Sequence, residues 1–305
     1  MNTRHKAFSV VELLTVITII SLLLGLTIPA LQTARMRMRV TAERANLRMV
    51  DFALEKFADE LGFYPPSTPR PQLRMMQQPP DVNASWDQGA HILYESLLGL
   101  DNLGYQKDHF YYTHPMTGQP LAPGPSSPIP VATKRYEHNI QTESIHIGNL
   151  IDIPIPPPDP YGNKGWGPGW NLNDNPVFLD KLDVDNPRPI LYYRANKNRT
   201  LLRDPTPPGD AIEPIYEYMD NELITRYSPA FDRGKPDNGQ NLSAREYFFQ
   251  YIHDPQTGNG VFTNADARPY RKDSFILIGA GPDGMFGPNP RDNYRIDDIT
   301  NFERR

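Results

Sequence analysis

Residues 10–31 form one apolar run, VVELLTVITIISLLLGLTIPAL, which limits how this chain can fold. The run of 22 residues carries a single charge, that of Glu12. A helix rises about 1.5 Å per residue, so a helix of this length can cross the hydrocarbon core of a bilayer. The Val, Ile and Thr content does not favour a strand, because a lone segment in lipid must satisfy its own backbone hydrogen bonds. The run therefore predicts a membrane-spanning helix over about 10–31.

Three ordinary interpretations compete for this segment. A short polar leader, MNTRHKA, precedes it, as in a secretory signal peptide. A signal peptide would have an apolar region of about 7–15 residues and an A-x-A-like site, yet Ile28 stands two residues before Ala30. A plain signal anchor would tether any kind of domain. Glu12 also completes an S-x-x-E capping box with Ser9, so its role could be only to cap a helix.

The helical pattern continues past the apolar run. Apolar residues recur at 36, 40, 47, 50, 54, 57 and 61, a heptad-like stripe that only Glu43 interrupts. Gly62 supplies a stop signal, and Pro65 and Pro66 follow it. We expect one helix over 8–61, apolar on all sides over 10–31 and amphipathic over 32–61. A coiled-coil stalk is the alternative that this pattern leaves open.

Residues 6–14, KAFSVVELL, resemble the processing motif of type IV pilins and pseudopilins. The resemblance implies that a prepilin peptidase cuts between Ala7 and Phe8 and methylates the new amine. Ala7 stands where the family usually has Gly. Glu12 would be the fifth residue of the mature chain, and in the family's account its carboxylate pairs with the amine of Phe8 in a neighbouring subunit. Pro29 falls where the family commonly has a helix-bending proline.

Three further segments carry the resemblance. Residues 45–67 are similar to the end of the long helix in major pseudopilins of type II secretion systems, with Gly62, Tyr64 and Pro65 in the Gly-x-Tyr-Pro turn. DPYGN at 159–163 with ILYYRA at 190–195 looks like a family signature split by an insertion. The C-terminal stretches 274–287 and 292–302 resemble the last strand and loop of the same proteins.

The resemblance implies an α+β fold. Residues 1–7 would be the leader, 8–62 the long helix and 63–305 a pilin-like head in which that helix packs on a small antiparallel sheet. Pro accounts for 33 of 305 residues, about twice average usage, and much of it lies in long segments at 115–130 and 154–176, which we interpret as insertions.

Local patterns in the head predict two helices, at 87–100 and 242–253, and four strands, at 109–113, 145–151, 190–194 and 275–279. The second helix carries an aromatic stripe of Tyr247, Phe248 and Tyr251, which we expect to lie in a core rather than to form a ligand platform.

The C-terminal loop has two chemical interpretations. Gly279 to Gly284 satisfies G-x-G-x-x-G after a predicted strand, but the Gly- and Pro-rich sequence that follows cannot open the helix that a dinucleotide site needs. The resemblance instead implies calcium, with Asp283, Asp297 and Asp298 as candidate ligands, since hard oxygen donors suit this ion. The alternative is that these are turn aspartates without a metal.

Other chemistry finds little support. The absence of Cys excludes disulfides, thiol nucleophiles and Cys-ligated metals, and the sequence has no H-E-x-x-H, G-x-S-x-G or P-loop motif. Charge is near balance, at a net −5, so no nucleic-acid partner is expected. We do not expect an enzyme.

The resemblance therefore implies a structural subunit of a type II secretion pseudopilus or type IV pilus-like filament. Its partners would be further copies of itself, other pilins or pseudopilins, a prepilin peptidase and an inner-membrane assembly platform. It would be a single-pass inner-membrane protein with its head in the periplasm or outside. One feature opposes that topology, because arginines at 35, 37, 39, 44 and 48 follow the span and the positive-inside rule would place them in the cytoplasm. A membrane-anchored adhesin or an exported enzyme is the alternative.

Overall fold

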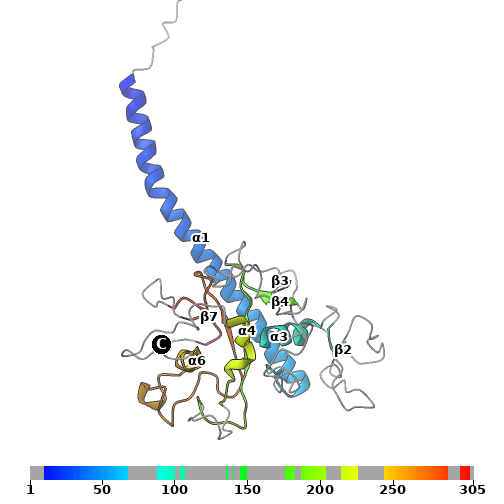
Figure 1. Cartoon of the computed structure of the whole chain (residues 1–305). Coiled ribbons are helices and arrows are strands. Elements are labelled where there is room, and N and C mark those ends of the chain that lie inside the picture. Colours follow the sequence, from blue (N-terminus) through cyan, green and yellow to red (C-terminus); the bar gives the residue numbers. More distant parts are fainter. Residues whose placement is uncertain are drawn as a thin grey trace, which may run out of the picture.

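The computed structural model shows an α+β protein in which one long helix carries a head of short helices and small antiparallel sheets (Figure 1). The N-terminal part of the long helix projects away from the head, and its C-terminal part runs along it. The structure describes residues 10–67, 88–99, 104–106, 135–136, 140, 145–149, 176–182, 187–203, 214–225, 244–287 and 296–302.

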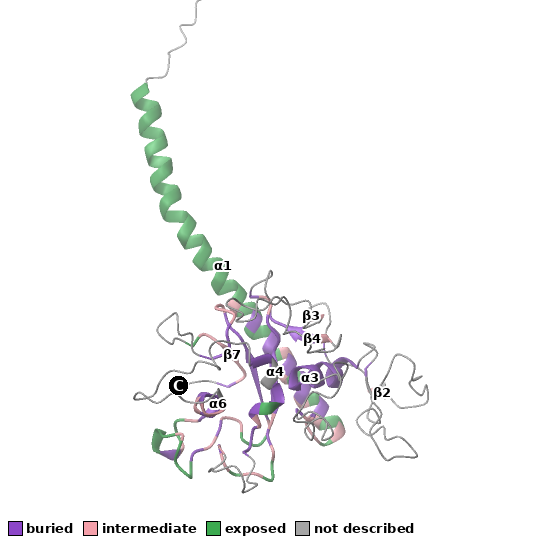
Figure 2. Cartoon of the chain, in the orientation of Figure 1, coloured by how far each residue is buried: buried purple, intermediate pink, exposed green. Residues whose placement is uncertain are grey.

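Helix α1 runs from Val10 to Leu61, and its 52 residues span about 78 Å at 1.5 Å per residue. It ends at Gly62, which has a φ of +82° that glycine adopts readily and whose N–H donates to the carbonyl of Ala58 at 2.8 Å. The continuous helix predicted from the apolar spacing is confirmed over the described residues. All residues from 10 to 39 are exposed in the single chain, whereas the head covers one face of α1 from Val40 onward (Figure 2).

The described helices of the head are α3 (Gly89–Leu98), α4 (Glu222–Thr225) and α6 (Ala244–Ile252), with 3-10 turns η4 (Tyr218–Asn221) and η5 (Gly258–Gly260). Its described strands form three antiparallel sheets rather than one. These are β1 (Tyr105–Gln106) with β2 (Arg135–Tyr136), β3 (His146–Asn149) with β4 (Pro176–Leu179), and β5 (Leu191–Arg194) with β6 (Phe275–Gly279) and β7 (Ile299–Thr300).

The sheet of β5, β6 and β7 lies between two hydrophobic clusters. Successive side chains of a strand point to opposite faces. Tyr192 and its cross-strand neighbour Leu277 therefore pack with the α1 side, while Tyr193 and its neighbour Ile276 pack with α6. Both faces of this sheet are buried, so β5 and β6 have the near-continuous apolar sequences that made them recognisable.

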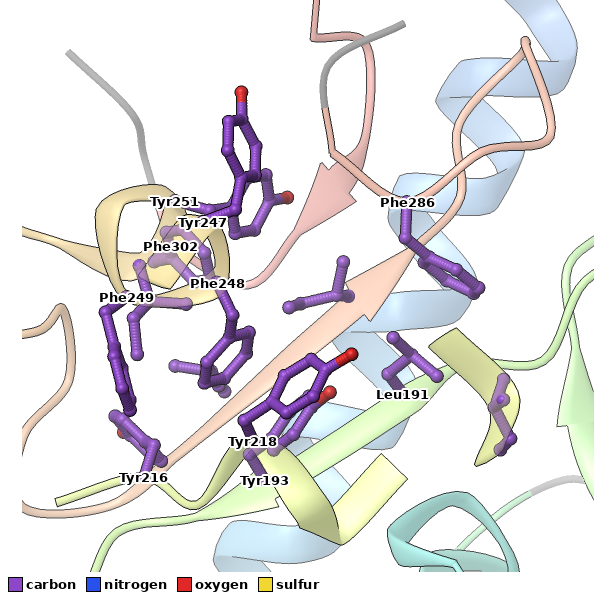
Figure 3. Close-up of a cluster of buried hydrophobic side chains, with 14 of the residues drawn as sticks. Leu191, Tyr193, Tyr216, Tyr218, Tyr247, Phe248, Phe249, Tyr251, Phe286 and Phe302 are labelled. Carbon is purple, nitrogen blue, oxygen red and sulfur yellow. The ribbon is translucent and has the colours of Figure 1, made fainter. Parts of the chain in front are cut away.

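The cluster on the α6 side is rich in aromatic rings (Figure 3). Phe248 of α6 lies 4.8 Å from Tyr193 of β5 and 5.7 Å from Tyr218 of η4, measured between ring centroids. Tyr247, Phe248 and Tyr251 are all buried, so the prediction that this stripe belongs to a core is confirmed. Rings at such separations add packing energy beyond their buried area.

Most local predictions agree with the observed elements, whose bounds are the same or shorter. The helices predicted at 87–100 and 242–253 appear as α3 and α6, and the strands predicted at 190–194 and 275–279 appear as β5 and β6. The strand predicted at 145–151 is described only as β3. The loop predicted over 154–176 was set one residue too long, because Pro176 opens β4 and pairs with Asn149. The strand predicted at 109–113 and the insertion at 115–130 lie outside the described residues.

Candidate functional site

The N-terminal half of α1 presents apolar side chains on all sides. Fourteen Val, Leu and Ile side chains between Val10 and Leu31 are 45–78% exposed in the single chain. Among the described residues, α1 is the one helix long and apolar enough to cross a membrane, and none of its most apolar stretch is buried against the rest of the chain. This surface needs lipid or another protein to cover it.

The threonine hydroxyl groups within this half donate hydrogen bonds to backbone carbonyls of the same helix. Thr15 donates to the carbonyl of Val11 at 2.8 Å, Thr18 donates to that of Leu14 at 2.8 Å, and Thr33 donates to that of Pro29 at 3.0 Å. A hydroxyl bonded within its own helix demands no external partner in an apolar medium. Thr27 likewise donates to the carbonyl of Leu24, at 3.4 Å, so all four threonines are compatible with a lipid-covered or helix-covered surface.

Two of the predicted assembly residues lie on this half. Glu12 is exposed in the first described turn of α1, and Pro29 stands inside the helix, which continues through it. The carboxylate of Glu12 is thus placed at one end of the apolar surface. The predicted cleavage residues Ala7 and Phe8 lie outside the described residues.

The C-terminal half of α1 packs against the head through one face. Leu47, Val50, Leu54 and Phe57 are buried at 5% exposure or less, so the predicted apolar stripe is confirmed at these positions. Val40 and Leu61 pack at the edge of the same cluster. The chain after α1 is held as well, since the hydroxyl of Tyr192 donates to the carbonyl of Pro65 at 2.6 Å.

Arg271 ties α1 to the loop before β6. Its Nη2 lies 3.2 Å from Oδ1 of Asp51 and 3.1 Å from Oε1 of Glu55, and its guanidinium stacks 4.8 Å from the ring centroid of Phe275. The other oxygen of Glu55 accepts a hydrogen bond from the hydroxyl of Tyr64 at 2.6 Å. Burial, and then this contact, raise the pKa of Tyr64 to about 12. Arg271 holds its position at a left-handed φ of +48°, which is strained for a non-glycine residue.

We expect Arg271→Ala to lower the free energy of unfolding by about 1–2 kcal/mol, because two carboxylates lose their shared cation and Phe275 loses its stacked partner. The near-UV circular dichroism of the buried tyrosines, followed during denaturant titration of the full chain in detergent, measures this. Lys272→Ala removes the same charge from the exposed neighbouring residue and should change stability by less than about 0.5 kcal/mol. Equal effects of the two substitutions would contradict the role given to Arg271.

A buried pair of carboxyl groups lies where α1 enters the head. Glu43, the one residue that interrupts the apolar stripe, is 1% exposed, and so is Asp180 just after β4. Oε2 of Glu43 accepts hydrogen bonds from the backbone N–H of Lys181 at 3.0 Å and from Asn46 at 3.3 Å. Oδ1 of Asp180 accepts from the backbone N–H of Arg188 at 3.2 Å. The second oxygen of each carboxyl group is buried without a hydrogen bond among the described residues.

Burial changes the acidity of this pair. Desolvation raises the pKa of Asp180 to about 7, against the lowering effect of its backbone hydrogen bonds, and the nearby charge of Glu43 adds to the rise. Desolvation also raises the pKa of Glu43 above its ordinary value, while hydrogen bonds from Lys181 and Asn46 and the charges of Lys181 and His146 oppose the shift. The stripe pattern marks Glu43 as an exception, but no sequence signal connects it to Asp180.

The three predicted calcium ligands border the loop after β6. Oδ1 of Asp283 accepts from the N–H of Met285 at 2.9 Å, and Oδ2 of Asp298 accepts from the N–H of Gly287 at 2.8 Å. Asp297 lies against Gly281, where an added Cβ would come within 2.6 Å of its Oδ1. The described residues contain no group of three acidic or histidine side chains arranged to hold a metal, so a calcium ion here would also need main-chain oxygens. Calcium binding stays a prediction.

A groove of about 1130 Å³ runs between α1, α6 and β7. Arg44 and Arg48 of α1 line one side, Tyr247 and Tyr251 of α6 another, and Asp298 with the residues of β7 the third. The lining mixes cations, aromatic rings and backbone, which suits a polar ligand or a protein segment.

Comparisons of this chain with protein-family models, with curated proteins and with solved structures find no match.

Proposed function

We propose that this chain is a structural subunit of a filament of the type II secretion pseudopilus or type IV pilus kind. One observation carries the proposal: α1 is a single continuous helix whose N-terminal half is bare and apolar on every side, while its C-terminal half is fixed in an α+β head. This division suits a subunit whose bare helix halves pack together in a core and whose heads form the outer surface.

The distribution of apolar residues supports packing among copies. Exposed Val, Leu and Ile side chains occur around the whole circumference of α1 up to Leu31. A helix that is apolar on all sides is stable inside a membrane or at the centre of a bundle. Such a helix can move from lipid to a bundle of its copies without exposing apolar surface to water.

Glu12 gives the bundle a means of setting register. A carboxylate in an apolar segment costs several kcal/mol unless it finds a partner. The resemblance to pilins supplies one, the N-terminal amine of Phe8 in an adjacent copy. A buried pair of this kind would select one axial offset between neighbouring helices, as a buried polar residue does in a coiled coil.

The same proposal gives the chain its partners and location. A prepilin peptidase would cleave it at Ala7–Phe8 in the inner membrane, and an assembly platform would add it to the filament with other pilins or pseudopilins. The head would lie on the periplasmic side. The chain would have no catalytic activity of its own, and a calcium ion held by Asp283 and Asp298 with main-chain oxygens would order the C-terminal loop.

The mass of the N-terminal peptide, taken from membranes of the native host, tests this proposal. We expect a peptide that begins at Phe8 and carries one extra methyl group. A chain that still begins at Met1 would indicate a plain membrane anchor. A start near residue 31 or 35 would mean a removed signal peptide and would contradict the filament function.

A membrane-anchored binding module is the second candidate, and the groove beside α6 favours it. A ligand there would contact Arg44, Arg48 and the tyrosines of α6. A binding module would retain its function with an unprocessed N-terminus, so the same peptide mass separates the two candidates.

A further inference from the structure

The arginines that follow the apolar segment have no role in the filament proposal. Residues 13–42 contain no acidic residue, yet Arg35, Arg37 and Arg39 stand within eight residues of Leu31. Arg35 and Arg37 are exposed and lie before Val40, where the head begins to cover α1. They therefore belong to a short, strongly basic stretch between the apolar segment and the head.

Helix geometry places Arg35 and Arg37 at the depth of lipid headgroups. If the hydrocarbon core ends near Leu31, the Cα atoms of Arg35 and Arg37 lie about 6 Å and 9 Å beyond it, at 1.5 Å per residue. The headgroup layer is roughly 5–8 Å thick on each side. Side chains of an α-helix tilt toward its N-terminus, which here is toward the membrane, so both guanidinium groups reach back into this layer.

The three acidic residues of α1 that follow these arginines most closely in the sequence have partners elsewhere. Glu43 is buried against Lys181, and Asp51 and Glu55 share Arg271. Among the described residues, the structure gives the guanidinium groups of Arg35 and Arg37 no hydrogen-bond or ion-pair partner, while that of Arg39 donates to the carbonyl of Leu182 at 3.2 Å. Both guanidinium groups can therefore bind an anionic group that does not belong to the described part of the chain.

We propose that Arg35 and Arg37 bind the phosphate groups of anionic phospholipids in the leaflet at the C-terminal end of the apolar segment. The planar guanidinium group donates two parallel hydrogen bonds to a phosphate, and clusters of basic residues beside a membrane-spanning helix attract anionic lipids. At 100° per residue the two side chains point about 160° apart, so lipids on opposite sides of α1 would be held. These contacts would fix the depth of the helix in the bilayer.

This inference rests only on insertion of the apolar segment in a membrane and not on filament assembly. Arg44 and Arg48 provide an internal control. They are also exposed, but their Cα atoms lie about 20 Å and 26 Å beyond Leu31, outside the headgroup layer. The same change of charge can thus be made at two depths on one helix.

Native mass spectrometry of the unassembled full chain in a neutral detergent, titrated with phosphatidylglycerol or with phosphatidylcholine of the same acyl chains, tests the proposal. We expect preferential binding of phosphatidylglycerol. Arg35→Gln with Arg37→Gln should weaken that binding by about fivefold per arginine removed, while Arg44→Gln with Arg48→Gln should leave it unchanged.

Three results would overturn the proposal. The first is equal affinity of the wild-type chain for the two lipids. The second is an equal loss of binding in both double variants, which would mean that only the overall charge matters. The third is a variant at Arg35 and Arg37 that loses dimers and keeps its lipid, which would mean that a second copy of the chain is the partner. None of these outcomes bears on the filament proposal, which the mass of the N-terminal peptide tests separately.

Discussion

Glu12→Leu is expected to leave the chain in the membrane at the wild-type level but to reduce contact between copies at least tenfold. Leu removes the free-energy cost of placing a carboxylate in an apolar segment, so insertion of the helix in the membrane should not decrease. It also removes the group that would pair with a neighbouring amine and set the offset between helices. Loss of a buried pair of this kind is worth several kcal/mol per contact, enough to prevent ordered assembly.

Chemical cross-linking can measure this effect because the chain contains no Cys. A single Cys in place of the exposed Leu24, joined by a flexible bismaleimide in membranes of the native host, should give a ladder of multimers in the wild-type background. Thr15→Leu is the matched control, since the hydroxyl of Thr15 is bonded to the carbonyl of Val11 in its own helix. An unchanged ladder in Glu12→Leu would contradict the role of Glu12 in assembly.

Asp180→Asn is expected to stabilise the head by about 2–4 kcal/mol at pH 8 and by little at pH 4. In the folded chain the pKa of Asp180 is raised to about 7 from an ordinary value of 3.8. Between these values the folded state binds more protons than the unfolded state, so stability falls as pH rises from about 4 to 7. Asn cannot ionise, and it retains the oxygen that accepts from the N–H of Arg188.

Unfolding curves of the wild-type chain and of Asp180→Asn must be measured across this pH range, because other carboxyl groups also change the stability of each protein with pH. The difference between the two free energies of unfolding should grow with pH and level off above about 7. Asp59→Asn, at an exposed position of α1, should give a curve parallel to that of the wild-type chain. A constant difference between Asp180→Asn and the wild type would show that Asp180 has no raised pKa.

Local sequence patterns determined the long helix and the main elements of the head. The apolar run, the stripe at Leu47, Val50, Leu54 and Phe57, and the stop at Gly62 depend on spacing within a few helical turns, which the sequence displays directly. Strands β5 and β6 were predictable because burial on both faces gives continuous apolar runs. Strands β1, β2 and β7 have two residues each, too few for any alternation to be visible.

The resemblance to pilins placed Glu12 and Pro29 on the long helix, and the structure shows both there. The resemblance also grouped Asp283, Asp297 and Asp298, and in the structure all three border one loop. The carboxylates of Asp283 and Asp298 accept hydrogen bonds from backbone N–H groups of that loop. Ala7 and Phe8 lie outside the described residues, so cleavage at this motif stays a prediction.

Contacts between distant parts of the chain were decided by the tertiary structure alone. Glu43 meets the backbone of Lys181 across 138 residues, and Arg271 reaches Glu55 across 216. No periodicity links such pairs, because each depends on how α1 docks against the sheets rather than on local conformation. The sequence by itself determined a long helix with one bare and one amphipathic half. Docking of the amphipathic half then decided which acidic groups are buried and which arginines of α1 are left to face outward.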